Sequence, residues 1–157
     1  GVLFLIISLT PIRAWLINSI PKSLKLGIGA GIGLFFDLDN FKKVNDKFGH
    51  QMGDKILLLF GNSLTKIAYN FQNLFVYRLY GDEFFVFCEG HDKEIAEKFS
   101  QLVHDDLRNN KDITSLEIPI EASMGYSKFN TSTDIDDFIK NADYAMYQNK
   151  ILKKAIK

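Results

Sequence analysis

The chain has 157 residues, 46% of them hydrophobic, which is enough for one domain with a substantial core and no need for disulfides or a structural metal. Lysine plus arginine and aspartate plus glutamate both number 19, so no overall basic field favours binding to nucleic acid. The single cysteine, Cys88, lies in an apolar run, which fits a reducing compartment and a buried, inert thiol.

The first 36 residues differ from the rest, because they are apolar and glycine-rich and contain no acidic residue. Prolines and basic residues, among them Pro11, Arg13 and Pro21, interrupt this stretch before it reaches the ~18–20 apolar residues that span a bilayer. We expect no complete transmembrane helix within this chain. A cleavable signal is not expected either, because no charged region precedes the apolar stretch.

Residues 1–35 resemble part of a bacterial nucleobase permease of the adenine and hypoxanthine type, through the runs at 8–13 and 20–35. A transport role would need many more membrane spans than 157 residues provide. The likeness therefore implies a fused or chimeric start, or a chance similarity. We divide the chain into an atypical apolar segment, residues 1–33, and one domain, residues 34–157.

Strand and helix patterns follow one another along the rest of the chain. Apolar runs and alternation indicate strands, helical spacing of apolar residues indicates helices, and Gly81 between two aromatic-rich runs predicts a tight hairpin. The expected elements are a strand over Gly31–Leu38, helices over Asn40–Phe48 and Gly53–Tyr69, a hairpin over 75–88, a helix capped by Asp92, a strand over Ile118–Phe129 and a helix over Ile135–Ile151. This order predicts an α+β fold with helices packed on a central, mainly antiparallel sheet.

Two acidic motifs are candidates for chemistry. Asp37 and Asp39 stand two residues apart at the end of a buried strand, so their carboxylates project from one face. Such a pair taken alone more often belongs to a cap or turn, although hard carboxylate oxygens also suit magnesium. Asp82 and Glu83 lie at the hairpin tip, where successive residues point to opposite faces. One acid could bind a cation while the other positions or deprotonates a nucleophile.

Polar residues between these motifs suit purine recognition. The amide of Asn45 can pair with a base edge, and Asp54 can accept hydrogen bonds from the ring N–H and amino group of guanine. The histidines have plainer interpretations: His50 is expected to be a hydrogen-bonding residue in a turn, and His91 and His104 are expected at the surface.

The run from Asp37 to Asp54, followed by Arg78-Leu-Tyr-Gly-Asp-Glu-Phe84, resembles the GGDEF domain of bacterial diguanylate cyclases. The likeness continues through Ser123–Tyr126 and Asn141–Lys150 and covers about residues 34–154. It implies a sheet flanked by helices, similar to nucleotidyl cyclases and polymerase palms.

Carried over residue by residue, the resemblance implies that Asp37, Asp82 and the backbone carbonyl of Leu38 bind Mg²⁺ or Mn²⁺. It implies Glu83 and Asp82 as catalytic residues, with Glu83 supporting the reacting 3′-hydroxyl. The family usually has arginine at the position of Lys154. The ammonium group of lysine is a point charge and lacks the paired N–H donors of a guanidinium group. The implied substrate-binding residues are Phe41, Lys42, Asn45, Asp54, Gly81, Lys150 and Lys154.

The implied reaction joins two GTP molecules into cyclic di-GMP with loss of pyrophosphate. Each domain would hold one GTP, so catalysis would require a homodimer. The resemblance also implies a cytoplasmic location, alone or as the cytoplasmic part of a membrane-associated protein. We further expect an upstream sensor domain in the full-length protein, and none within the residues that precede the motif here.

The sequence departs from the family at three places. Tyr80 stands where the signature has its first glycine, and its side chain removes room that a close backbone approach would use. The Arg-x-x-Asp inhibition motif is replaced by Phe71-Gln-Asn-Leu74, so product inhibition at that site is not expected. The usual opening motif is disrupted, with only Leu9, Thr10 and Arg13 similar to it. Three hypotheses stay open: a cyclase, a GTP-binding regulator without efficient turnover, and a structural or dimerisation domain.

Overall fold

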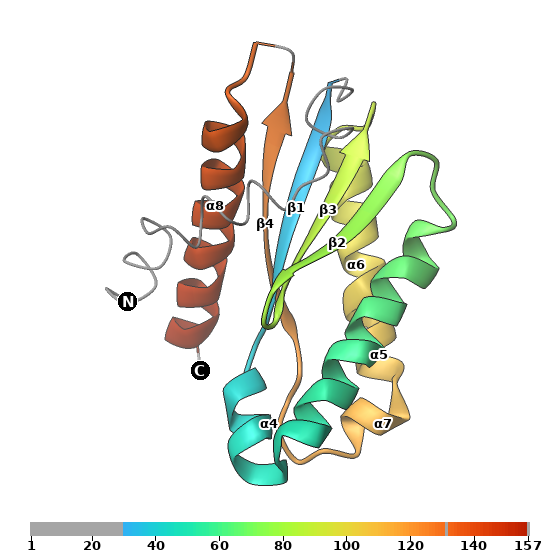
Figure 1. The fold of residues 1–157 in the computed structure, drawn as a ribbon, viewed down its shortest axis with the longest axis vertical. Helices are drawn as coiled ribbons and strands as arrows, with labels where there is room; N and C mark the ends of the chain where they lie inside the picture. The colour runs from blue at the N-terminus through green and yellow to red at the C-terminus, as the bar shows by residue number, and fades with distance from the viewer. Residues whose placement is uncertain (1–29, 131, 157) are drawn as a thin grey trace.

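The computed structural model describes residues 30–130 and 132–156. Its centre is a four-stranded sheet with strand order β2-β3-β1-β4, in which all neighbouring strands are antiparallel and helices cover both faces (Figure 1). The predicted α+β fold is confirmed. The elements in chain order are β1 (Gly31–Leu38), α4 (Phe41–Phe48), α5 (His50–Ala68), β2 (Leu74–Tyr80), β3 (Glu83–Glu89), α6 (Lys93–Asn109), α7 (Lys111–Thr114), β4 (Ala122–Phe129) and α8 (Ile135–Ile156).

β1 is the central element, since all eight of its residues are buried. A strand covered on both faces needs apolar side chains on both, which explains the continuous apolar run in the sequence. At the C-terminal end of β1, the pairing register places Asp37 opposite Glu83 on β3 and Ser123 on β4. The acidic residues of distant sequence segments therefore meet at one end of the sheet.

The two faces of the sheet pack against different helices (Figure 1). On one face, Phe36 contacts Phe60 of α5 and Phe99 of α6, with ring centroids 6.1 and 6.2 Å apart. On the other face, Phe85 lies 6.2 Å from Phe138 of α8 in an edge-on arrangement. Edge-on pairs of this kind contribute about 0.5–1.5 kcal/mol beyond the burial of their area. Because side chains alternate along each strand, one face of the sheet packs against α5 and α6 and the other face packs against α8.

A close backbone approach holds α8 against β4. Gly125 has no side chain, and a Cβ atom there would collide with the backbone nitrogen of Met146 and the carbonyl of Ala142. Only glycine permits this contact. The approach brings the last turns of α8 to the end of the sheet where Asp37 lies.

Several predicted boundaries were wrong, for physical reasons. α5 begins at His50 rather than Gly53, because Gly49 takes a positive φ of 86° and the next helix starts immediately after it. β4 begins at Ala122 rather than Ile118, since Pro119 has no N–H to donate to a ladder. α8 continues to Ile156 rather than Ile151, because the residues after Ile151 include good helix formers and no glycine or proline.

Two predictions about single residues have opposite outcomes. Cys88 is fully buried, as expected, and burial raises the pKa of its thiol to about 12. The prediction of a surface position for His104 was wrong. Its Nδ1 lies 2.8 Å from the carbonyl oxygen of Ser100, and its Nε2 lies 2.8 Å from that of Ala122, so the half-buried ring joins α6 to the start of β4.

No helix in the described part of the chain is both long and apolar enough to cross a membrane. Most of the predicted N-terminal segment, residues 1–29, lies outside the described residues, and so does the disrupted opening motif. The permease likeness and the division at residue 34 stay predictions.

Candidate functional site

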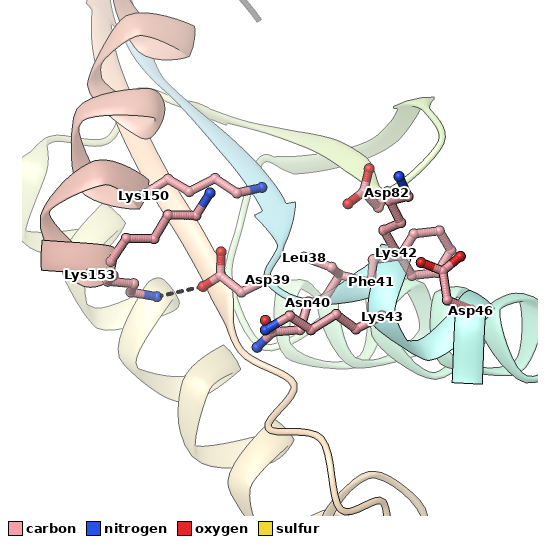
Figure 2. Close-up of a pocket in the computed structure, with 11 residues that line it drawn as sticks. Leu38, Asp39, Asn40, Phe41, Lys42, Lys43, Asp46, Asp82, Lys150 and Lys153 are labelled. Carbon is pink, nitrogen blue, oxygen red and sulfur yellow. Dashed lines mark hydrogen bonds and ion pairs between the residues drawn. The ribbon is translucent and has the colours of Figure 1, made fainter. Parts of the chain in front are cut away.

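A cavity of about 710 Å³ opens where β1 ends, between the start of α4, the hairpin turn and the last turns of α8. Figure 2 shows Lys150 and Lys153 extending from α8 on one side, and Asp82, Phe41 and Lys42 on the other. The cavity is lined by Leu38, Asp39, Asn40, Phe41, Lys42, Lys43, Asp46, Asp82, Lys150, Lys153 and Lys154.

Two carboxyl groups converge beside this cavity. Asp37 is 4% exposed, its carboxyl group lies close enough to that of Asp82 to interact with it, and Lys150 Nζ lies 2.5 Å from Asp37 Oδ2. Burial, and then the hydrogen bond and charge of Asp82, raise the pKa of Asp37 to about 8 against the opposing effect of Lys150. Burial alone would lower the pKa of Lys150, but the Asp37 carboxylate outweighs it and raises that pKa. The pair of acids is thus an electrostatically costly arrangement that a cation stabilises.

Glu83 lies next to Asp82 in sequence but on the α8 side of the sheet, within electrostatic range of Asp143. Burial, then the charges of Asp143 and Asp82, raise the pKa of Glu83 to about 7. A carboxyl group with such a pKa can accept a proton near neutral pH. That the two adjacent acids have separate tasks stays a prediction, because Asp82 lies in the turn before β3 and both acids are within electrostatic range of Lys150.

Asp39 has a structural role that its spacing to Asp37 did not reveal. Its Oδ1 accepts a 2.8 Å hydrogen bond from Ser123 Oγ, and its Oδ2 lies 3.2 Å from Lys153 Nζ. Lys153 also donates to the carbonyl oxygen of Ala122 at 2.7 Å. Sequence reasoning missed Lys153, although its position three residues after Lys150 places it on the same helical face.

The cavity carries a formal excess of two positive charges, because five lysines and three aspartates line it. Lys150 and Lys153 have carboxylate partners. Within residues 30–130 and 132–156, the structure records no ion pair for Lys42, Lys43 or Lys154. These three ammonium groups are available to an anionic ligand.

The predicted guanine readers lie beside the cavity rather than in its lining. Asn45 on α4 packs against Gly53 of α5, where a Cβ atom would collide with the Asn45 side chain. Asn45 Oδ1 is buried and has no hydrogen-bond partner within the described residues. Asp54 follows Gly53 and is exposed. A buried polar atom without a partner is costly, so a ligand that supplied a donor there would be favoured.

The hairpin turn separates the roles of Tyr80 and Gly81. Gly81 takes the positive φ of 55°, whereas Tyr80 has a negative φ and is 59% exposed. A register shift lies between Arg78 and Tyr80, and Arg78 Nε donates to the Gly81 carbonyl at 3.0 Å. Tyr80 does not line the cavity. The turn accommodates tyrosine at position 80 without strained backbone. The exposed Tyr80 side chain therefore occupies only space outside the turn.

Across the described ranges, no group of three or more His, Cys, Asp or Glu side chains is arranged to hold a metal ion. The available oxygen ligands at the site are the two carboxylates of Asp37 and Asp82 and the main chain of Leu38. Magnesium usually takes one or two carboxylates and completes its shell with water and substrate phosphates. The donors present fit that pattern.

Comparison with known proteins identifies the family. The model of the "Diguanylate cyclase, GGDEF domain" family matches residues 28–155. The biofilm architecture maintenance protein MbaA of Vibrio cholerae is 36% identical over 125 residues, which cover 74% of this chain and 16% of that protein. Diguanylate cyclase DgcP of Escherichia coli is 33% identical over 118 residues, which cover 74% of this chain and 34% of that protein. The chain therefore spans at most about a third of these relatives.

Solved structures agree with the fold. The active GGEEF domain of a diguanylate cyclase from Vibrio cholerae superposes with a TM-score of 0.69 at 25% identity, covering 82% of this chain and 81% of that chain. The GGDEF domain of YfiN (TpbB) from Pseudomonas aeruginosa gives a TM-score of 0.71 at 23% identity, covering 89% of each chain, and shows the fold alone. The converging acids, the Tyr-Gly-Asp-Glu-Phe turn and the family match lead to one assignment: this chain belongs to the GGDEF domain family of diguanylate cyclases.

Proposed function

We propose that this domain condenses two GTP molecules into cyclic di-GMP and pyrophosphate. The observation that carries the proposal is the convergence of Asp37 and Asp82 at the edge of a lysine-lined cavity of about 710 Å³. The homologous DgcP is named as a diguanylate cyclase, and the GGEEF domain of similar fold is described as active.

Asp37 and Asp82 would hold the divalent cation together with the carbonyl of Leu38. When bound, magnesium or manganese neutralises phosphate charge and makes the α-phosphate a better target for attack. Lys150, which contacts Asp37 Oδ2, would turn from that carboxylate toward the phosphates as the carboxylate takes up the metal.

The nucleotide would lie across the cavity. Lys42, Lys150 and Lys154 would neutralise the triphosphate, with Phe41 of the cavity lining beside it and Gly81 in the turn next to Asp82. Asn45 and Asp54 would read the guanine edge, because Asn45 has a buried oxygen without a partner and Asp54 can accept from both guanine donors. This placement separates phosphate binding in the cavity from base recognition on the neighbouring α4–α5 surface.

In the chemical step, the 3′-oxygen of one GTP forms a bond to the α-phosphorus of the other, and the bond to pyrophosphate breaks. Glu83, whose pKa lies about 7, would accept or orient the 3′-hydroxyl proton. Two such steps close the ring and release two pyrophosphates. Each domain binds one GTP in this scheme, so two domains must face each other.

The larger setting of the domain is also a proposal, since the chain spans only part of its relatives. We propose a homodimer as the active form and a sensor domain elsewhere in the full-length protein that controls pairing. A cytoplasmic location is proposed because GTP is a cytoplasmic substrate.

The direct test incubates the purified domain, fused to a dimerising coiled coil, with GTP and magnesium and detects cyclic di-GMP by mass spectrometry. Asp82→Asn should abolish the product, because the amide keeps the size of the side chain but loses its charge. Lys128→Gln is a matched control, since Lys128 is exposed on β4 and does not line the cavity. Absence of product in the dimerised, unaltered domain would contradict the proposal.

A second function is favoured by Tyr80, which replaces the first glycine of the signature and stands exposed at the hairpin tip. The domain would then bind GTP and regulate a partner without efficient turnover. Calorimetry that shows GTP binding together with no product would select this function over the cyclase.

A further inference from the structure

Lys153 is the one lysine of the cavity that is held in a fixed position by groups outside the proposed metal site. Its ammonium group lies 2.7 Å from the Ala122 carbonyl oxygen and 3.2 Å from Asp39 Oδ2, with Glu121 Oε2 further away at 4.0 Å. Asp39 is itself fixed, because Ser123 donates to its other oxygen at 2.8 Å. The side chain of Lys153 is therefore ordered before any ligand arrives.

An ammonium group has three N–H donors, and two of them are used by the Ala122 carbonyl and Asp39. The third is left for a ligand. Lys153 lines the cavity, its side chain is 30% exposed, and Figure 2 shows it extending toward the end of β1. A cation that is partly shielded and already oriented binds an anion without the full entropic cost of ordering a long side chain.

The neighbouring Lys154 contrasts with it. Lys154 also lines the cavity, but it is exposed, and the described residues offer it no recorded ion pair. It is an unrestrained point charge at a position where the forked side chain of arginine would hold two oxygens. We propose that Lys153, rather than Lys154, supplies the fixed contact of this chain to the polyphosphate of the nucleotide. The identity of that nucleotide as GTP rests on the proposed function.

The charge of Asp39 does not cancel this role. The cavity keeps a formal excess of two positive charges with Asp39 counted. The alternative is that Lys153 only neutralises Asp39, whose side chain is 15% exposed. The two roles differ in what happens when both partners are made neutral together.

The experiment measures calorimetric affinity for magnesium–GTP, for GMP and for inorganic tripolyphosphate in four proteins: the unaltered domain, Lys153→Gln, Asp39→Asn with Lys153→Gln, and Lys154→Gln. The double variant keeps an amide pair of similar size and leaves no buried charge without a partner. We expect Lys153→Gln and the double variant to weaken binding of GTP and tripolyphosphate about tenfold, with GMP almost unchanged. Lys154→Gln should weaken them about twofold.

Recovery of full affinity in the double variant would overturn the inference, because it would mean that Lys153 acts only on Asp39. Equal losses in the Lys153 and Lys154 variants would overturn it as well. Thermal unfolding of each variant separates loss of fold from loss of contact. If the unaltered domain binds tripolyphosphate with this dependence on Lys153 but shows no preference for GTP, the proposed function fails while the inference about Lys153 stands.

Discussion

Gly53 is the residue that fixes Asn45, and a single methyl group there tests guanine recognition. In a helix interior, glycine to alanine is normally favourable by up to about 1 kcal/mol. Here the new Cβ would collide with the Asn45 side chain. We expect Gly53→Ala to weaken GTP binding about tenfold and to reduce the ratio of the affinities for GTP and ATP. The reason is that the new methyl group displaces the Asn45 oxygen that has no partner.

The matched control is Gly61→Ala in the same helix, where the new Cβ would meet only two ring carbons of Phe84, at 3.4 and 3.9 Å. It should bind GTP like the unaltered protein. Competition binding with GTP and ATP measures both effects, and an unchanged preference in Gly53→Ala would remove Asn45 from the base-recognition site.

Tyr80 tests whether the departure from the family signature affects binding or turnover. Its side chain is 59% exposed and does not line the cavity, so the affinity of Tyr80→Gly for GTP should stay within about twofold of the unaltered value. Turnover should rise, because in the proposed mechanism a second GTP-loaded domain would approach the tip from which the ring projects. Steady-state release of pyrophosphate measures this, and equal turnover in the two proteins would show that the steric argument is wrong.

The parts of the site that could be predicted from sequence were those with a motif of fixed spacing. Asp37, Asp82 and Lys150 meet although 113 residues separate Asp37 and Lys150, and their common location follows from the order of the strands and the family resemblance. The spacing of Lys153 to Lys150 placed it on the right helical face, but its contacts to Asp39 and Ala122, and the partnerless oxygen of Asn45, could not be predicted, because they depend on side-chain contacts between elements. The spacing of residues within one helix does not specify such contacts.

At the scale of elements, α5 and α6 are joined through Asp106, and this joint predicts how stability changes with pH. Ser63 Oγ and Lys66 Nζ each donate to the Asp106 carboxylate at 2.6 Å. Burial alone would raise the pKa of Asp106, but the hydrogen bonds from Lys66 and Ser63 outweigh it and lower the pKa below its ordinary value of 3.8. The stabilisation is therefore present above about pH 4 and is lost as the pH falls through the lowered value.

We expect Asp106→Asn to lower the free energy of unfolding by about 0.5–1 kcal/mol at pH 7, and the difference from the unaltered protein to shrink below pH 4. Urea unfolding at a series of pH values measures the difference. Asp105→Asn is the control, because its contacts to Arg108 and Gln101 lie within α6 and do not reach α5. A constant difference from pH 7 to pH 3 would contradict the electrostatic origin.

The elements themselves were predictable where one local signal dominated. The unbroken apolar run of β1 and the glycine turn between β2 and β3 are such signals, and both elements were predicted to within a residue or two. α7 was missed, because its four residues, Lys111–Thr114, carry too short a pattern to distinguish from a turn. The late start of β4 depends on Pro119 and on where its backbone finds partners, which alternation of side chains does not report.

At the scale of the whole molecule, ligand binding should stabilise the fold if the cavity is a nucleotide site. A ligand at 100 times its dissociation constant adds about 2.7 kcal/mol, which corresponds to a rise in Tm of about 5–10 °C for a chain of this size. We expect this rise with GTP and magnesium, and a smaller one with ATP and magnesium, in a thermal-shift measurement. An unchanged Tm would favour the third hypothesis, a structural or dimerisation domain.

The proposed pairing of two facing domains predicts how activity depends on protein concentration. For the domain without an added dimerising segment, product formation per domain should rise with protein concentration and then level off as pairs saturate. Initial rates over a roughly hundredfold range of protein concentration, enough to cross a weak dimer equilibrium, measure this dependence. A rate per domain that stays constant down to the lowest concentration, with monomer shown by sedimentation, would contradict the pairing mechanism.

The buried position of Cys88 has a practical consequence. It is the only thiol in the chain, it is completely enclosed on β3, and its pKa of about 12 keeps it unreactive in the folded state. Alkylating reagents can reach the thiol only when the central strands separate, so the rate of Cys88 labelling measures the rate of global opening of the sheet. A cysteine introduced at an exposed position would meanwhile react alone, and spectroscopic probes could be attached there without first removing the natural thiol.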